Sequence, residues 1–134
     1  MAIWTGWLAA ALIVATGCFP IVMRFRLGKR ALPDAKPMRW HVMVGLTTGT
    51  IAFLHTLVVV PALGAPGAVG GGMLALGAGG LAFFALVAHT GLGFQLRRPK
   101  LRDRVQKRRA HLTTAILIVA LVGVHVVALL GGEH

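Results

Sequence analysis

Several residue types that build metal and disulfide sites are scarce in this chain. Cys18 is the single cysteine, which excludes an intrachain disulfide and a cysteine metal cluster. Acidic residues number three in 134, so carboxylate ligands are few. No Lys or Arg precedes Arg24, so the first apolar run lacks the basic region of a cleaved signal peptide. We therefore expect that run to be a membrane span.

Long apolar runs occupy most of the chain, in which 57% of the residues are hydrophobic and the mean hydropathy is +0.80. Four of these runs are long enough to cross a bilayer, at about residues 3–23, 38–60, 73–96 and 110–130. The sequence thus predicts an all-α fold, a four-helix transmembrane bundle forming a single integral membrane domain over residues 1–134. This leaves no room for a nucleotide- or flavin-binding module on the same polypeptide.

Basic residues are confined to two segments, Arg24–Arg39 and Arg97–Arg109, which hold all 14 Lys and Arg residues. The net charge of +11 would suggest nucleic-acid binding in a soluble protein, but this placement is the positive-inside pattern of a multi-pass membrane protein. Both segments are therefore expected in the cytoplasm, with both termini on the other side. The interpretation favours the bacterial cytoplasmic membrane and membrane lipid as surroundings, with no nucleic-acid partner.

Four of the six histidines form two pairs with equal spacing. His41 and His55 are 14 residues apart, as are His111 and His125, and each pair lies in one apolar run. At about 100° per residue, 14 steps return a side chain to within about 40° of its starting direction. The rise of about 1.5 Å per residue separates the imidazoles of a pair by about 21 Å, most of the thickness of a bilayer core. Each helix is predicted to present one histidine near each membrane surface.

The expected topology brings these histidines together at two depths. The second and fourth spans both run outward from the cytoplasm, so they are parallel. His41 and His111 then form an inner pair near the cytoplasmic face, and His55 and His125 form an outer pair. Bis-histidine ligation of two stacked haems needs this arrangement, so we predict these four histidines as metal and cofactor ligands.

Residues between the paired histidines also suit a flat cofactor. On the second span the shared face reads Gly45, Thr48 and Ala52, and small residues there let imidazole reach an iron. On the fourth span Ile118 is bulkier and would help to fill the gap between two haems, while Gly123 is expected near the outer ligand. The third span is rich in small residues, which let neighbouring helices approach closely.

Simpler interpretations of the histidines remain open. A single intramembrane histidine often serves only as a hydrogen-bonded packing residue. Four in matched register on parallel helices are harder to ascribe to packing, because each ring nitrogen in hydrocarbon needs a partner. Copper and zinc also bind imidazole. Two-histidine sites with no Cys, Asp or Glu nearby favour haem, whose macrocycle supplies four further ligands.

Three further residues are candidates for supporting roles. His89 on the third span lies at the depth of the inner pair and could hydrogen-bond a propionate or quinone, replace a ligand, or only pack. Arg39 and Arg109 each precede an inner ligand by two residues. They either neutralise the propionates of an inner haem or serve as ordinary interfacial anchors. The outer side has no comparable cation, which leaves water, Thr56 or a partner protein for the outer propionates.

The pattern resembles the haem core of the cytochrome b superfamily, because two parallel helices each carry His-x13-His within a four-helix bundle. Respiratory cytochrome b subunits and the membrane domains of ferric reductases and NADPH oxidases share this scheme. The resemblance covers spans two to four by topology, and span one only by count. It implies two haem b groups stacked across the membrane, one held by His41 and His111 and the other by His55 and His125. It also implies transmembrane electron transfer, by an electron-transfer subunit rather than a stand-alone enzyme.

The partners follow from what four spans cannot hold. Without a redox domain, the chain is expected to work with a redox partner protein or with other subunits of a complex. Quinone or quinol is a further candidate partner, although no quinone-site motif is recognisable. Two alternatives come from other classes: a non-haem metal or proton transporter, and a structural assembly subunit. Neither explains the equal spacing of the histidine pairs.

Overall fold

The computed structural model describes residues 2–28, 35–64 and 71–132. Four long α-helices and one short 3-10 helix make up these ranges, and no strand occurs in them. They are α1 (Ala2–Leu27), α2 (Lys36–Val59), the 3-10 helix η1 (Val60–Gly64), α3 (Gly72–Leu96) and α4 (Arg104–Gly131). The all-α prediction is confirmed. All four α-helices are long and apolar enough to cross a membrane, which confirms the four predicted spans.

Helix boundaries follow local sequence signals. Pro37 lies in the first turn of α2, where its missing N–H group costs nothing. Pro61 follows the end of α2, and the chain continues there as η1 because proline cannot donate the next helical hydrogen bond. Pro20, expected to kink or end the first span, lies inside α1, which continues to Leu27. The predicted turn over residues 61–72 lies partly outside the described residues.

The second basic segment differs from expectation at its end. Arg104–Arg109 form the first turns of α4, instead of the separate surface helix that Pro99 suggested. The Arg104 guanidinium donates to the carbonyls of Leu96 (3.1 Å) and Pro99 (3.2 Å), which ties the start of α4 to the end of α3. Lys107 pairs with Asp103 at 3.3 Å, a carboxylate at the positive end of the helix. These contacts explain why the basic residues are helical.

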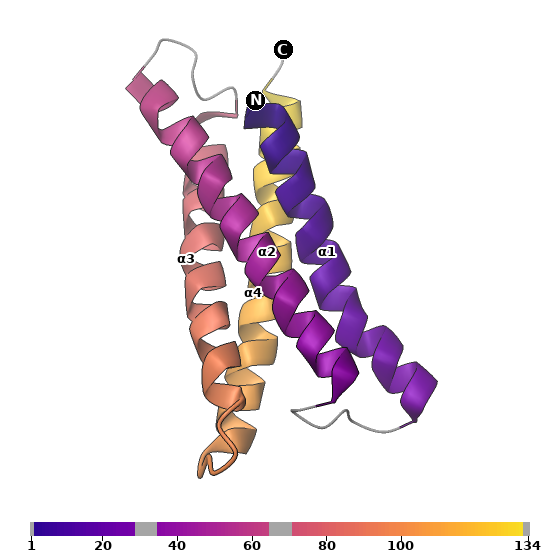
Figure 1. The fold of residues 1–134 in the computed structure, drawn as a ribbon. Coiled ribbons are helices and arrows are strands. Elements are labelled where there is room, and N and C mark those ends of the chain that lie inside the picture. Colours follow the sequence, from indigo (N-terminus) through magenta and orange to yellow (C-terminus); the bar gives the residue numbers. More distant parts are fainter. Residues whose placement is uncertain (1, 29–34, 65–70, 133–134) are drawn as a thin grey trace.

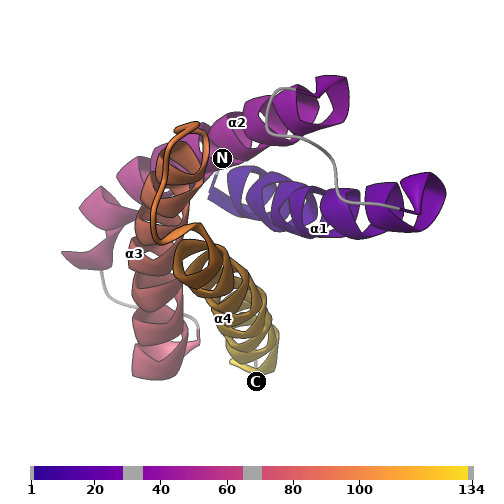
Figure 2. The ribbon, with the colours of Figure 1, turned by 90° about the horizontal axis from the view of Figure 1, so that it is seen from below.

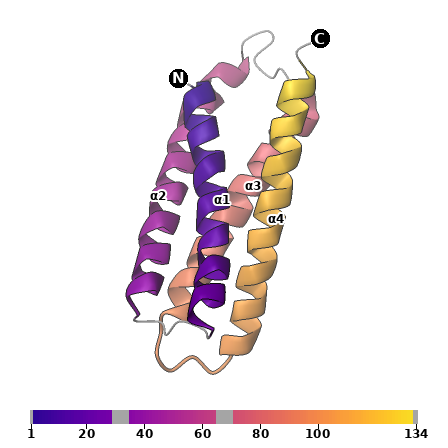
Figure 3. The ribbon, with the colours of Figure 1, turned by 90° about the vertical axis from the view of Figure 1, so that its right-hand side faces the viewer.

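The helices form two antiparallel hairpins, α1 with α2 and α3 with α4. Contacts within each hairpin are closer than those between α2 and α3 or between α1 and α4. Viewed along the bundle, α2 and α4 lie diagonally opposite each other (Figure 2). The two ends of the chain lie at one end of the bundle, and the helix ends bordering both basic segments lie at the other (Figures 1 and 3). The predicted parallel course of the histidine-bearing helices is therefore confirmed.

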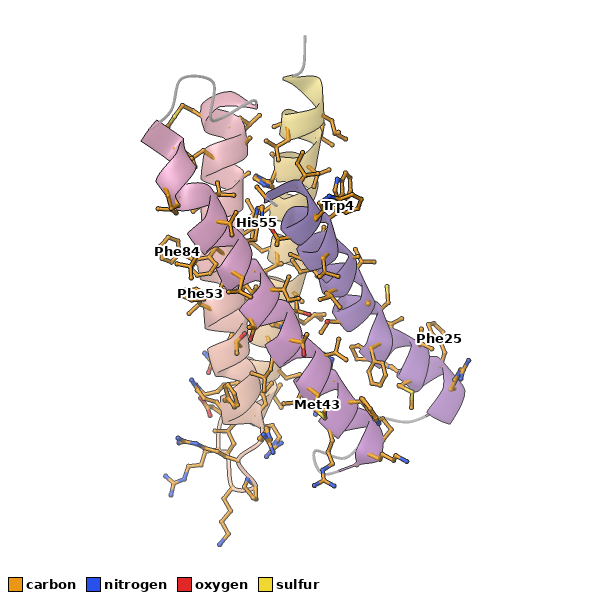
Figure 4. The ribbon with its side chains drawn as sticks, turned by 45° about the horizontal axis from the view of Figure 1, so that its top comes forward. Trp4, Phe25, Met43, Phe53, His55 and Phe84 are labelled. Atoms are coloured by element: carbon orange, nitrogen blue, oxygen red, sulfur yellow. The ribbon has the colours of Figure 1, made fainter. Side chains whose placement is uncertain are left out.

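Small residues occupy the interior and large apolar residues face outward. Ala75, Ala78 and Ala82 of α3 are buried, whereas Trp4 and Phe25 of α1 are largely exposed and project away from the bundle (Figure 4). Water would penalise this distribution, but lipid tails are as apolar as leucine, so helix association there depends on close approach of small residues. The packing supports an integral membrane protein.

Candidate cofactor-binding site

The inner layer contains three histidines, one from each of three helices. The ring centroids of His41 (α2) and His111 (α4) are 6.4 Å apart, with their planes at 86°. His89 of α3 stacks on His111 with centroids 3.7 Å apart and planes at 14°. The predicted inner pair therefore forms across the diagonal of the bundle. His89 also belongs to this layer, at the expected depth.

The outer layer contains the other predicted pair. His55 of α2 lies within electrostatic range of His125 of α4, and both rings are half-buried. Each ring is held by a different neighbouring helix: His55 contacts α1 and His125 contacts α3. The four predicted ligands are thus sorted into the two layers that their sequence spacing indicates.

The two α4 histidines bind backbone carbonyls of α3 through the same ring nitrogen. The Nδ1 atom of His125 lies 2.7 Å from the carbonyl oxygen of Ala75, and the Nδ1 atom of His111 lies 3.2 Å from that of His89. A carbonyl oxygen can only accept, so each neutral ring carries its proton on Nδ1 and keeps the lone pair on Nε2. Histidines that bind metals commonly donate their other N–H in this way.

His55 uses a hydroxyl group in place of a carbonyl. Its Nδ1 atom lies 3.1 Å from Oγ1 of Thr5, and that hydroxyl also donates to the carbonyl of Ala2 at 2.9 Å. With the hydroxyl proton directed at Ala2, the Thr5 oxygen accepts from the His55 ring. Figure 4 shows His55 between α2 and the first turns of α1.

His41 has the least complete support of the four. Its Nδ1 atom is buried and has no hydrogen-bond partner among the described residues. Phe19 of α1 stacks beside the ring, with centroids 6.3 Å apart and planes at 16°. A buried imidazole nitrogen without a partner is costly, and such a group in a native fold needs an explanation such as an absent ligand or water.

Three glycines on neighbouring helices make room for the rings. A Cβ atom built on Gly79 would lie 2.8 Å from Nδ1 of His125, and one on Gly6 would lie 3.1 Å from Cε1 of His55. On Gly93 the corresponding distance to Cε1 of His111 is 3.4 Å. The sequence reasoning missed these positions. Their signal was visible, because Gly79 and Gly93 are 14 residues apart, like the histidines that they contact.

Midway between the layers, each ligand-bearing helix buries one residue almost completely. Thr48 of α2 is 2% exposed and Ile118 of α4 is 3% exposed. The Thr48 hydroxyl lies 3.0 Å from that of Thr16 of α1 and donates to the carbonyl of Val44. Gly45 faces the methyl group of Thr16, so it packs against α1. The prediction that these helix faces point inward is confirmed at Thr48 and Ile118.

Other predicted residues lie farther from the rings. Arg39 and Arg109 are exposed at the basic end of the bundle, one turn or less before the inner histidines. The expectation for Gly123 is wrong, because it is exposed and borders an apolar surface with Val119 and Val127. Two residues of α-helix turn the chain by about 200°, which directs Gly123 away from the His125 face. The Thr56 hydroxyl bonds to its own helix.

The two hairpins place equivalent residues around equivalent histidines, a relation that the sequence reasoning had not found. Each functional position of the first hairpin has a counterpart 70 residues later in the second, with the same neighbours. The equivalent positions are Thr5 and Ala75, Phe19 and His89, His41 and His111, Thr48 and Ile118, and His55 and His125. The site therefore has approximate twofold symmetry, with each layer built from one histidine of each hairpin.

The inner pair fits two trans ligands of one metal. Metal–imidazole bonds of about 2 Å on opposite sides of an ion put the ring centroids about 6 Å apart. The observed 6.4 Å between His41 and His111 matches this spacing. No three His, Cys, Asp or Glu side chains within the described part of the chain gather around one point as ligands of a bare ion. The donor set is two imidazoles per layer, which suits a cofactor that brings its own equatorial ligands.

Comparisons of the chain with protein-family models, with curated proteins and with solved structures find no match. The function is therefore argued from the chain's own residues and their geometry.

Proposed function

We propose that this protein transfers electrons across a membrane through two bis-histidine haem b groups. His41 and His111 hold the inner haem, and His55 and His125 hold the outer one. The observation that carries the proposal is the pairing of histidines from diagonally opposite helices at two depths, with Nδ1 of three of the four bound to a neighbouring helix. That arrangement leaves the Nε2 lone pairs available as ligands.

The chain supplies the ligands, their orientation and an apolar surround. When bound, the haems supply the one-electron chemistry. Thr5 and the carbonyls of Ala75 and His89 fix three imidazole rings, which limits the movement of the ligands. The buried Thr48 and Ile118 separate the two layers and exclude water from the middle of the bundle. This division of roles explains why the conserved spacing within each helix is matched on its neighbour.

The two faces of the membrane offer different surroundings to the two layers. Arg39 and Arg109 stand at the basic end, where their guanidinium groups neutralise propionates of the inner haem or anchor the helices at lipid headgroups. The electron donor and acceptor are separate molecules: a redox partner protein, other subunits of a complex, or a quinol. The positive-inside pattern places the basic end in the cytoplasm of a bacterium, with His55 and His125 near the outer surface.

Single histidine substitutions test the ligand assignment. His55→Ala or His125→Ala should each remove one of two haems and retain the other, and His41→Ala or His111→Ala should each remove the other one. His89→Phe is the matched control, because phenylalanine occupies the equivalent position 19 in the first hairpin. This variant should keep both haems. The proposal fails if every histidine variant retains two haems, or if the unaltered protein binds none and instead transports a metal ion or protons.

A further inference from the structure

We propose that Gly79 and Gly93 are positioning residues that uncover α3 carbonyl groups for the α4 histidines. Each glycine lies one helical turn after the residue whose carbonyl accepts the histidine proton. Gly79 follows Ala75 by four residues, and Gly93 follows His89 by four. The ligand role of these histidines rests on the proposed function, but their hydrogen-bonded state does not.

The geometry of an α-helix explains why glycine stands at these positions. The carbonyl of residue i accepts from the N–H of residue i+4, so its oxygen lies beside that residue. The oxygen has a second lone pair that can accept from outside the helix. A Cβ atom at i+4 narrows the approach to this lone pair, whereas glycine leaves it open. On α3 an imidazole occupies the space next to Gly79 and next to Gly93.

The two positions differ in how little space they leave. A methyl group at residue 79 would lie 2.8 Å from Nδ1 and 2.9 Å from Cε1 of His125, inside van der Waals contact. The ring would have to move, which breaks its 2.7 Å bond to Ala75. At residue 93 the methyl group would lie 3.4 Å from Cε1 and 4.0 Å from Nδ1 of His111, so a small movement suffices. The effect of alanine should therefore be larger at residue 79 than at residue 93.

The consequence for the histidine is a fixed tautomer. A backbone carbonyl accepts only a proton-bearing nitrogen, so it holds each α4 imidazole with Nδ1 protonated and Nε2 free. The first hairpin does this less strictly, because the Thr5 hydroxyl that contacts His55 can donate or accept. We therefore assign to α3 the role of fixing the tautomer of His111 and His125. Together the two glycines prepare the α4 face to bind a metal through Nε2 before any cofactor arrives.

Nitrogen-15 NMR of the haem-free full-length protein, labelled at histidine and kept in lipid at alkaline pH, tests this directly. In the unaltered protein both His111 and His125 should show the tautomer protonated at Nδ1. Gly79→Ala should shift His125 toward the tautomer protonated at Nε2 and leave His111 unchanged. Gly80→Ala is the matched control on the same helix, because nothing lies within 4 Å of a Cβ atom there.

Haem titration of the same variants gives a second readout. Gly79→Ala should weaken the outer haem about 10- to 100-fold, with the inner haem unaffected, which is the usual cost of losing a hydrogen bond that supports a metal ligand. Gly93→Ala should weaken the inner haem by a smaller factor. If either α4 histidine of the unaltered protein is protonated at Nε2, the inference is wrong whatever the variants do. If the tautomers are as expected and no haem binds, the positioning role stands and the proposed function fails.

Discussion

Removing the Thr5 hydroxyl should weaken the outer cofactor site without changing a ligand. Thr5→Val keeps the side-chain shape and deletes the oxygen that lies 3.1 Å from Nδ1 of His55. His55 then keeps a half-buried N–H group without this partner, and an unsatisfied buried donor costs about 1–3 kcal/mol. Since about 1.4 kcal/mol corresponds to a factor of ten, haem affinity at the outer site should fall about 5- to 150-fold.

The assay isolates the outer site by using the His41→Ala background, in which the inner pair lacks one ligand. Purified haem-free protein is titrated with haem, and the dissociation constant is compared with and without Thr5→Val. Thr50→Val is the control, because the Thr50 hydroxyl is exposed and bonds only to the Leu46 carbonyl of its own helix. Thr5→Ser should restore most of the affinity. Equal affinity in the Thr5→Val and control proteins would refute the supporting role of Thr5.

Two further predictions concern packing and topology. Ile118→Ala should lower the free energy of unfolding by about 2–5 kcal/mol, because it empties a buried position between the layers, whereas Ile116→Ala at an exposed position should have little effect; chemical denaturation in detergent measures both. In a Cys18→Ala background, a cysteine at Asp103 should react with a membrane-impermeant thiol reagent only from the cytoplasmic side, and one at Gly132 only from the outside. Labelling of both from the same side would overturn the expected orientation.

The helix number and the histidine layers could be predicted from the sequence because they depend on local properties. Apolar length sets the number of spans, and the basic segments set which spans run in parallel. The 14-residue spacing then places His41 with His111 and His55 with His125, since equal spacing on parallel helices keeps partners at equal depth. None of these steps requires knowledge of how a helix is rotated against its neighbours.

Rotation and contact between helices are what the sequence reasoning could not supply. His89 was placed at the correct depth, but its stacking on His111 depends on which face α3 turns toward α4. Gly79 and Gly93 were hidden among 18 glycines, most of which contact no histidine. They stand out only once the antiparallel packing of α3 and α4 is known. Gly123 was misplaced for a simpler reason, since its angular position on α4 already separates it from His125.

The 70-residue relation between the hairpins was also missed, because it is carried by positions and not by residue types. Thr5 corresponds to Ala75, and one supports its histidine through a side chain while the other does so through the backbone. Phe19 corresponds to His89, and both present a flat ring to an inner histidine. Sequence comparison of the two halves would not align such pairs, although the structure gives them the same role.

The most direct test of the central claim is the dithionite-reduced minus oxidised absorption spectrum of the purified protein, with haem quantified per chain. The proposed ligand pairs predict b-type absorption bands and two haems per chain. A freshly isolated protein that is colourless and binds no added haem would contradict the proposal, and the histidine layers would then serve a metal ion, protons or helix packing.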